Sequence, residues 1–387
     1  MSHYMLSITG LCQQRCQFCF ERRGRSPRDT PKEEVIKLLQ TAAREVDGVL
    51  FMGTESTLHR DFPTLCRRAK ELGLRVSVSS NILRFSDAAF LNECVEAGLD
   101  DIELSFHYPD ARSYRAITGV NEANWERLLR AMDNIDAHAI NRNAPVTAGP
   151  RRGISGVNVN IVVNEHNVDR LDEVVGHLAR HLPNSSVNVT FKKPYFAPPS
   201  PMLSRGCGDA EGDPTSLPLS KIGAAIAELF RSWPAPQASY LLRGFHGLCT
   251  VPGYEDRSAD VRDICRKVLI RQNLGQKKNF KLAIPRADQL MLWYQSRSCI
   301  PCSLSRICAL LMFAQNQYGR YRDFNGPSFS PSDLDPVDVI RRSPTGRLER
   351  GGPTKEEALA LLEAVRVPPD GTGGVRRSRW SPIELDA

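Results

Sequence analysis

Three cysteines lie close together near the start of the chain, in the stretch GLCQQRCQFCFERRG. Cys12, Cys16 and Cys19 have the spacing C-x3-C-x2-C. Structural zinc sites use four protein ligands, so three thiolates are one short of a closed tetrahedral site. Three ligands on one tight loop instead suit a [4Fe–4S] cluster in which one iron keeps an open position for an exogenous ligand.

A second group of cysteines lies in the last third of the chain and includes SCIPCSLSRIC, which has the spacing C-x2-C-x5-C. Its members are Cys249, Cys265, Cys299, Cys302 and Cys308. In a reducing compartment clustered cysteines indicate metal binding rather than disulfides. Cys66 and Cys94 fall at apolar positions of predicted helices and are expected to be core thiols. Cys207, in SRGCGDAEG, is interpreted as an exposed linker thiol, with a hydrogen-donor role as the alternative.

The composition of the chain indicates in which compartment this chemistry takes place and which classes of partner are expected. The chain has 387 residues and a net charge of +7. Its start has no signal-peptide pattern, and no stretch approaches the roughly 18 apolar residues of a membrane span. The basic stretches are short and lack interleaved aromatics, so we expect neither a membrane nor a nucleic-acid partner. The predicted location is cytoplasmic.

The first cysteine group must be positioned by the strands and helices that the sequence pattern predicts around it. Six short apolar runs alternate with amphipathic helical patterns, which favours a parallel sheet covered by helices. The predicted strands are 5–10, 48–53, 74–80, 100–106, 157–163 and 186–193. Thr30 with Glu33 predicts a capping box, with Pro31 at the first helical position of the first helix. The cysteine loop follows the first strand and so lies at the carboxyl ends of the strands, where such folds place their chemistry.

The sequence divides into four predicted parts. A core covers residues 1–196, and a Pro/Gly-rich linker with one helix covers 197–238. A cysteine-containing domain covers 239–324, and a polar, largely irregular tail covers 325–387, which we expect to be partly disordered.

The first cysteine group carries a resemblance to a known family. CQQRCQFC is similar to the C-x3-C-x-aromatic-C signature of the radical S-adenosylmethionine (SAM) enzymes, with Phe18 in the aromatic position. FMGTESTLHRDF resembles the G-G-E-P segment that ends the family's second strand. Gly53 and Glu55 match that segment, whereas Thr54 and Ser56 depart from it.

Three later segments extend the resemblance over about the first two hundred residues. VSSNILRF resembles the T-N-G stretch after the third strand, with Asn81 matching. ELSFHYPDARSYRAITG resembles the stretch after the fourth strand, where Ser105 matches and His107 replaces the usual Asp. VNVNIVVNEHN resembles the fifth strand. The order and spacing of the matches make the resemblance more specific than the cysteines alone.

The resemblance implies a fold, a cofactor and a set of site residues. The implied fold is α/β, a partial (β/α)6 TIM-like barrel, and Cys12, Cys16 and Cys19 are the implied catalytic cluster ligands. SAM would occupy the open iron position. The implied cofactor contacts are Phe18, Gly53, Thr54, Glu55, Ser80, Asn81, Ser105 and His107. Glu55 as a helix cap, Ser105 as an ordinary strand-end residue and Phe18 as a packing residue remain alternatives.

The second cysteine group resembles the auxiliary iron–sulfur domains of this family, the SPASM domain and its shorter twitch form. The resemblance implies at least one auxiliary [4Fe–4S] cluster. Its expected ligands are Cys265, Cys299 and Cys302, with Cys249 ahead of Cys308 as the fourth. Two clusters, zinc or no metal are the alternatives.

The implied function is an oxidoreductase that modifies or crosslinks a peptide by hydrogen abstraction. The alternative is a dehydrogenase or epimerase of a small metabolite such as an aminosugar, and a more distant one is a zinc-binding interaction protein. The implied partners are a flavodoxin- or ferredoxin-type reductase and a separate peptide-recognition protein. His59 and His107 are candidates to touch substrate or SAM, whereas His166, His177 and His181 are expected to face solvent.

Overall fold

The computed structural model describes residues 3–19, 28–140, 153–192, 217, 219–232, 239–242, 248, 251–257, 303–306 and 334. The chain divides into two compact units. One comprises Met1–Leu217 and Glu228–Leu241, and the other comprises Pro218–Ala227 and Leu242–Ala387. Most of the second unit lies outside the described residues.

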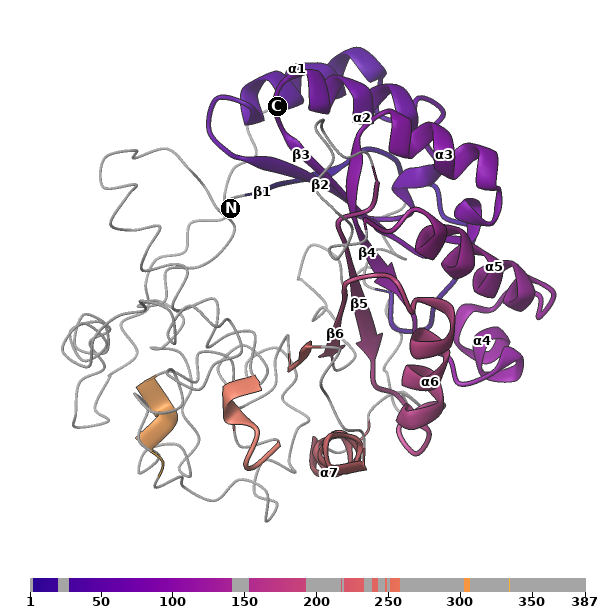
Figure 1. The fold of residues 1–387 in the computed structure, drawn as a ribbon, viewed down its shortest axis with the longest axis vertical. Helices are drawn as coiled ribbons and strands as arrows, with labels where there is room; N and C mark the ends of the chain where they lie inside the picture. Colours follow the sequence, from indigo (N-terminus) through magenta and orange to yellow (C-terminus); the bar gives the residue numbers. More distant parts are fainter. Residues whose placement is uncertain are drawn as a thin grey trace, which may run out of the picture. The chain divides into compact units, whose positions relative to one another are not determined.

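The first unit alternates strands and helices (Figure 1). The strands are β1 (His3–Ser7), β2 (Gly48–Met52), β3 (Arg75–Ser80), β4 (Leu99–Ser105), β5 (Gly156–Val162), β6 (Val187–Lys192) and β7 (Ser239–Leu242). The α-helices are α1 (Lys32–Ala42), α2 (Phe62–Glu71), α3 (Ala88–Glu96), α4 (Ala111–Thr118), α5 (Asn124–Ala137), α6 (Leu171–His181) and α7 (Leu219–Ser232). Short 3-10 helices include η2 (Ser56–Leu58), η3 (Leu83–Ser86), η5 (Glu255–Arg257) and η6 (Ser303–Arg306).

The strands form one sheet in the order β1-β2-β3-β4-β5-β6-β7. Each of the first five strands pairs in parallel with the next one along the chain. Helices α1 to α6 all lie on one side of this curved sheet (Figure 1). The predicted parallel α/β architecture, a partial (β/α)6 barrel, is therefore confirmed, and β7 adds a strand beside β6 that the sequence pattern did not predict.

The two faces of the sheet differ in chemistry because side chains alternate along each strand. One set, in register across neighbouring strands, is apolar and fully buried. Its members are Val49, Phe51, Val76, Val78, Ile102, Leu104, Val157, Val159, Ile161, Val189 and Phe191. The buried faces of the helices supply the other half of this core. We call it the outer face.

The opposite face, here called the inner face, is polar across β3 to β6. Register places two polar rows on it, Ser79–Glu103–Asn158–Asn188 and Ser105–Asn160–Thr190. Strands of a parallel sheet that is packed on both sides are usually apolar throughout. The polar rows therefore indicate a face built to meet polar groups rather than a second apolar layer.

The structure corrects two details of the pattern. Helix α4 falls in a segment for which no helix was predicted; its signals are Asp110, whose side chain accepts from Ser113 N (2.7 Å), and Gly119 at the end with φ +66°. The predicted capping box of the first helix is wrong. Helix α1 begins at Lys32, and Thr30 instead donates its backbone N–H to Ile8 O (2.9 Å).

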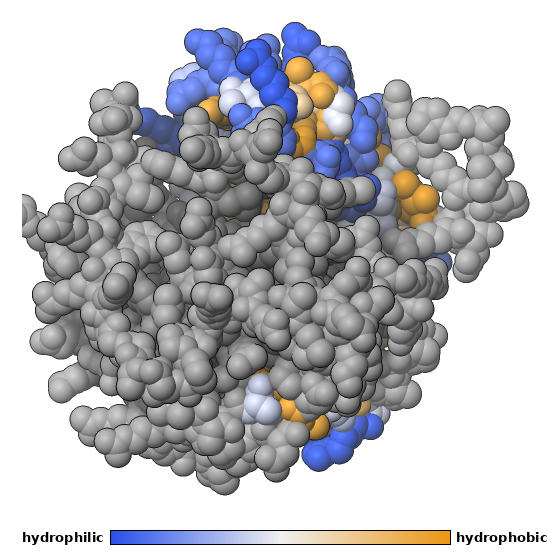
Figure 2. All heavy atoms as spheres, turned by 90° about the vertical axis from the view of Figure 1, so that its left-hand side faces the viewer, coloured by the Kyte–Doolittle hydropathy of each residue, from blue (hydrophilic) through white to orange (hydrophobic). Residues whose placement is uncertain are grey.

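Within the described residues, no helix has the length and apolar character needed to cross a bilayer. Figure 2 shows hydrophilic side chains interspersed with small hydrophobic patches among the coloured residues of one face. The large hydrophobic side chains exposed in this part of the chain are Met5 and Leu72.

Candidate active site

The cysteine loop begins at the carboxyl end of β1, and its root is closed by residues 28–30. Thr30 N donates to Ile8 O (2.9 Å), and Thr9 forms an antiparallel bridge with Asp29. The loop is therefore held at both ends. The three cysteines project from a fixed base, although residues 10–19 form neither a helix nor a strand.

Helix α4 anchors the middle of the loop. Arg15 N donates to Thr118 O (2.8 Å) and Gln17 N donates to Ile117 O (3.0 Å). The last carbonyls of a helix have no partner inside the helix, so they are natural acceptors for a crossing chain. The helix missed in the sequence thus fixes the segment between Cys12 and Cys19.

Cys12, Cys16 and Cys19 are all partly exposed. Within the described part of the chain, no three His, Cys, Asp or Glu side chains converge so as to hold a single metal ion. In a [4Fe–4S] cluster each cysteine binds a different iron, so the sulfurs must surround a volume instead of meeting at a point. Three partly exposed thiols on one anchored loop are compatible with that arrangement.

The segment after β2 sits directly on the root of the cysteine loop. Thr54 Oγ1 donates to Thr9 O (2.5 Å), and Glu55 N donates to Leu11 O (3.0 Å). Two motifs separated by some forty residues are thereby joined by one side-chain and one main-chain hydrogen bond. Thr54, which departs from the family pattern, contributes one of these bonds.

Gly53 has a conformation and surroundings that no other residue type fits. Its φ is +110°, and a Cβ at this position would lie 2.5 Å from Ser7 Oγ. Its missing side chain leaves the backbone of residues 53–54 accessible between β1 and β2. This is the cradle in which the resemblance places the methionyl end of SAM.

Glu55 is fully buried and acts as a hub between strand ends. Its Oε1 accepts from Thr57 Oγ1 (2.6 Å) and Ser80 Oγ (2.7 Å), and its Oε2 accepts from Asn81 N (2.7 Å). Burial raises the pKa of the Glu55 carboxyl, and these hydrogen bonds oppose that effect. Glu55 also caps η2 through Thr57 N. In the structure the side chain orients β2 and β3 relative to each other.

Asn81 links this hub to the cysteines. Its Nδ2 lies 3.9 Å from Cys12 Sγ, and its Oδ1 accepts from Gln13 Nε2 (3.0 Å) and from Leu83 N (3.1 Å). Asn81, which follows β3 and is 8 % exposed, thus connects the end of this strand to Cys12.

Ser105 and His107 occupy different surroundings although they are two residues apart. Ser105 ends β4 on the inner face, in register with Asn160. His107 is 3 % exposed, its Nδ1 accepts from Val162 N (3.1 Å), and its ring lies edge-on to Phe18 at 5.0 Å. Phe18 and His107 therefore pack the cysteine loop against β4 and β5.

Sequence reasoning missed three residues beside Cys16. Gln14, Tyr108 and Tyr114 are buried, and Gln14 Nε2 donates to the Tyr114 hydroxyl (3.2 Å). Cys16 Sγ donates to Gln14 Oε1 (3.4 Å), and the Tyr108 ring lies edge-on to Tyr114 at 4.9 Å. Only their positions in the sequence could have indicated these residues. Gln14 lies between two cysteines, and both tyrosines lie in the segment that follows Ser105.

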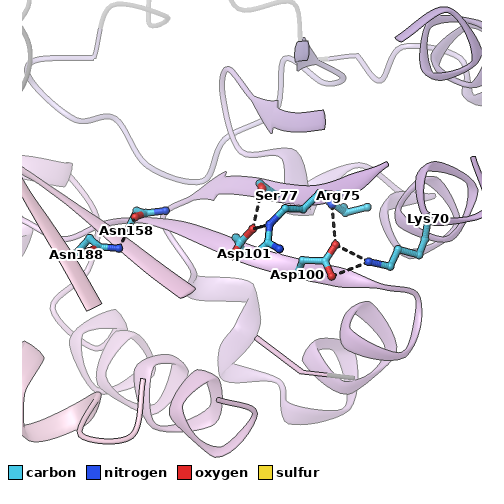
Figure 3. A network of polar contacts seen from close by, with 8 residues as sticks. Lys70, Arg75, Ser77, Asp100, Asp101, Asn158 and Asn188 are labelled. Atoms are coloured by element: carbon cyan, nitrogen blue, oxygen red, sulfur yellow. Dashed lines mark hydrogen bonds and ion pairs between the residues drawn. The ribbon is translucent and has the colours of Figure 1, made fainter. Parts of the chain in front are cut away.

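A network of charged and amide groups occupies the amino-terminal half of the inner face (Figure 3). The Arg75 guanidinium forms two hydrogen bonds to Asp101 (2.5 and 2.6 Å), and Ser77 Oγ reaches the same carboxylate (3.4 Å). Asn188 Nδ2 donates to Asn158 Oδ1 (3.1 Å). These groups bond one another. The polar row Ser105–Asn160–Thr190 lies nearer the carboxyl ends of the strands.

The histidine expectations are partly corrected. His59 is 1 % exposed, with Nε2 at Thr30 O (2.9 Å) and Nδ1 accepting from Asp61 N (3.0 Å), so both ring nitrogens serve the fold. His177 stacks edge-on against Trp125 at 5.2 Å, and His166 and His181 are half-buried. These last three side chains are therefore partly exposed and partly packed, rather than fully solvent-facing.

Several predicted features lie outside the described residues. They are Cys207 and all five cysteines of the second group, Cys249, Cys265, Cys299, Cys302 and Cys308. Cys66 and Cys94 are both fully buried, as expected for core thiols.

The sequence of this chain is similar to those of several known proteins. Residues 6–150 match the model of the Radical SAM superfamily. A probable GTP 3′,8-cyclase of Saccharolobus islandicus (strain Y.N.15.51 / Yellowstone #2) is 29% identical over 166 residues, which are 42% of this chain and 48% of the cyclase. A 7,8-dihydro-6-hydroxymethylpterin dimethyltransferase of Methanocaldococcus jannaschii is 25% identical over 122 residues, 30% of this chain and 24% of that protein. The match spans about half the length of the cyclases.

Among solved structures, Streptococcus suis SuiB bound to S-adenosylmethionine is similar, with a TM-score of 0.45 and 14% identity. The similarity covers 64% of this chain and 52% of SuiB. HydG, a maturase of the [FeFe]-hydrogenase, has a TM-score of 0.44 and 12% identity over 94% of this chain and 80% of HydG.

Proposed function

We propose that this chain, whose residues 6–150 form a radical SAM domain, is an enzyme that reductively cleaves SAM and abstracts a hydrogen atom from its substrate. One observation carries the proposal: Thr54 and Glu55, which follow Gly53, are hydrogen-bonded to the root of the loop that bears Cys12, Cys16 and Cys19. These bonds connect the Gly53 segment to the cysteine loop.

The residues divide the work of holding the cofactors. Cys12, Cys16 and Cys19 would hold the cluster, and the backbone at Gly53 and Thr54 would receive the SAM ammonium. When bound, cluster and SAM together supply a 5′-deoxyadenosyl radical, which is the difficult part of the chemistry.

The remaining site residues orient those groups and the substrate. Asn81 and Ser105 present polar groups at strand ends on either side of the loop, while the buried Glu55 keeps β2 and β3 in register. Phe18 and His107 cover one flank of the loop and limit water there. On the polar inner face, Asn160 and Thr190 would be available to contact the substrate.

For the substrate we propose a peptide or protein side chain that is oxidatively modified or crosslinked. The second cysteine group supports this, because an auxiliary [4Fe–4S] cluster near the substrate could accept the second electron of an oxidation. A flavodoxin- or ferredoxin-type reductase would supply the first electron, and a separate protein could present the peptide. The setting would be cytoplasmic.

A small-metabolite substrate is the second candidate, as in a dehydrogenase or epimerase. The names of the matched relatives favour it, since they refer to GTP and to a pterin. The amide-bearing inner face also suits a small polar molecule.

The direct test of the cofactor assignment is anaerobic reconstitution with iron and sulfide, followed by electron paramagnetic resonance (EPR) of the reduced protein. We expect a [4Fe–4S] signal that changes when SAM is added, because SAM would take the open iron position. A protein that binds only zinc, or a signal unaffected by SAM, would contradict the proposal. Cys94→Ala is the matched control, because Cys94 is buried in α3 away from the loop.

The two substrate classes are separated by supplying candidate substrates to the reconstituted enzyme. Consumption of a peptide with a mass loss that indicates oxidation would support the first class. Turnover of a nucleotide or sugar without any peptide would support the second.

A further inference from the structure

The polar inner face of the sheet carries one carboxylate without a counter-charge. Glu103 lies on β4, in register with Ser79 on β3 and Asn158 on β5, and is half-buried. Within the part of the chain that the structure describes, its side chain takes part in no hydrogen bond and no ion pair. A half-buried charge of this kind is costly to keep unless something else uses it.

The basic groups nearest to Glu103 do not neutralise it. Arg75 is directed at Asp101, with which it forms two hydrogen bonds (2.5 and 2.6 Å; Figure 3). Glu103 acts to raise the pKa of His3 on β1, but burial has the larger effect and lowers that pKa. The imidazole of His3 is therefore neutral at pH 7, and the negative charge of Glu103 remains uncompensated among the described residues.

Two buried polar side chains on the same face also lack partners. Asn160 is 8 % exposed and Thr190 is 6 % exposed, and neither side chain makes a hydrogen bond to any described residue. Register places them in one row with Ser105, one step nearer than Glu103 to the carboxyl ends of the strands. Buried amide and hydroxyl groups are nearly always hydrogen-bonded, because leaving them unbonded costs free energy. This row is therefore preorganised for the polar groups of a ligand.

The charge of Glu103 decides which ligand suits this face. An ammonium group carries three N–H donors and a positive charge, so it would form a charge-assisted hydrogen bond with the carboxylate. Neighbouring polar groups of the same molecule would bond Asn160 and Thr190. A phosphate or carboxylate placed here would instead be repelled by Glu103.

Resting on the proposed function, we propose that Glu103 determines substrate specificity by binding a protonated amino group of the substrate, with Asn160 and Thr190 as adjoining hydrogen-bonding groups. The substrate class is a primary amine, either the lysine side chain of a peptide or the amino group of a small molecule. This site is separate from the backbone of residues 53–54, which would receive the ammonium of SAM.

The test is equilibrium dialysis of the reconstituted, SAM-bound protein against two matched pairs of probes. One pair is glucosamine and glucose, and the other is a five-residue peptide with a central lysine and its norleucine analogue. We expect the amine of one pair to bind at least about tenfold more tightly than its neutral partner, which is about 1.4 kcal/mol. Glu103→Gln should remove that difference. A difference in the peptide pair would identify a peptide substrate, and one in the sugar pair a small molecule.

Glu126→Gln is the matched control, because Glu126 is exposed on α5, on the helix-covered side of the sheet. It removes the same charge away from the inner face, so the difference between amine and neutral probe should be kept. Wild-type protein that binds both members of each pair equally, or binds none, would overturn the inference. An undiminished difference in Glu103→Gln would also overturn it, and so would weaker SAM binding, which would place Glu103 in the SAM site.

Urea unfolding of Glu103→Gln separates recognition from a structural role. Because Glu103 has no described partner to lose, the urea midpoint of the variant should not fall below that of the wild type. A lower midpoint would show that the carboxylate supports the fold and would overturn the inference. A wild-type protein that takes up no [4Fe–4S] cluster would instead overturn the proposed function.

Discussion

At the scale of single residues, the contact between Gly53 and Ser7 is the most restrictive feature of the site. The positive φ of Gly53 and the 2.5 Å separation from a would-be Cβ to Ser7 Oγ make any side chain at this position strained. The backbone of residues 53–54 therefore stays accessible beside the cysteine loop. An enzyme that must receive a charged amino group at this position needs that access.

The first prediction concerns Gly53→Ala. The added methyl group would push Ser7 and the loop root apart, so we expect SAM to bind at least about tenfold more weakly, which is about 1.4 kcal/mol. Equilibrium binding of SAM to the reconstituted protein measures this. Adding Ser7→Gly should recover part of the loss because it removes the clashing atoms.

Gly73→Ala is the matched control for backbone strain. Gly73 also has a positive φ, +80°, but no atom lies within 4 Å of its would-be Cβ. This variant should lose about 1 kcal/mol of stability and bind SAM normally. Unaltered SAM binding in Gly53→Ala would contradict the role given to this glycine.

The spacing of the cysteines predicted a metal-binding loop, and the family resemblance added Gly53 as a site candidate. Neither predicted that Glu55 would be fully buried or that Tyr108 would be buried against His107 and Tyr114. Those facts depend on how β2, β3 and β4 meet in space. The sequence pattern at these positions contains only an isolated acid and an isolated aromatic residue.

At the scale of secondary-structure elements, α4 is the support of the cysteine loop. Its last carbonyls accept from Arg15 N and Gln17 N, and its first turn is capped by Asp110. Asp110 also pairs with Arg170, which precedes α6, at 2.5 Å. The helix was missed in the sequence because its eight residues are too few for a clear apolar period.

The second prediction uses the charge of Asp110. Burial opposes its ionisation, but bonds from Ser113 and Arg170 outweigh this and lower its pKa from 3.8 to about 2. Because the folded-state pKa is depressed, the stabilisation is present above about pH 4 and is lost as pH falls toward 2. Asp110→Asn keeps a good cap but loses the ion pair with Arg170.

Urea unfolding between pH 3 and 7 checks this prediction. The free energy of unfolding of wild type should exceed that of Asp110→Asn by up to about 1 kcal/mol at pH 7, as for a partly exposed ion pair. The difference should shrink below pH 4. Asp110→Ala should lose about 1 kcal/mol more because the cap is lost. A difference that grows as the pH falls would contradict the assignment.

At the scale of the whole molecule, the two faces of the sheet have different roles. The outer face carries the apolar core under the helices, and the inner face carries polar rows and the site. The strand–helix alternation predicted this parallel architecture well, since each unit has its own apolar pattern. It did not predict which strand residues face inward, because that depends on register between strands.

The third prediction concerns the second cysteine group. Replacing Cys299 and Cys302 with Ala should lower the iron content of the reconstituted protein by about four atoms per chain, one [4Fe–4S] cluster. SAM cleavage should persist, because the first cluster has its own ligands. Iron and sulfide analysis beside a Cys66→Ala control measures this. Full iron content in the double variant would contradict the proposed auxiliary cluster.

The central claim is that Cys12, Cys16 and Cys19, together with the Gly53 cradle, form a site that cleaves SAM. The most direct measurement is 5′-deoxyadenosine formation by the reconstituted protein with SAM and dithionite. We expect product from wild type and from Cys94→Ala, and none when Cys12, Cys16 and Cys19 are replaced with Ala. Formation of 5′-deoxyadenosine by the triple variant at the wild-type rate would contradict this account.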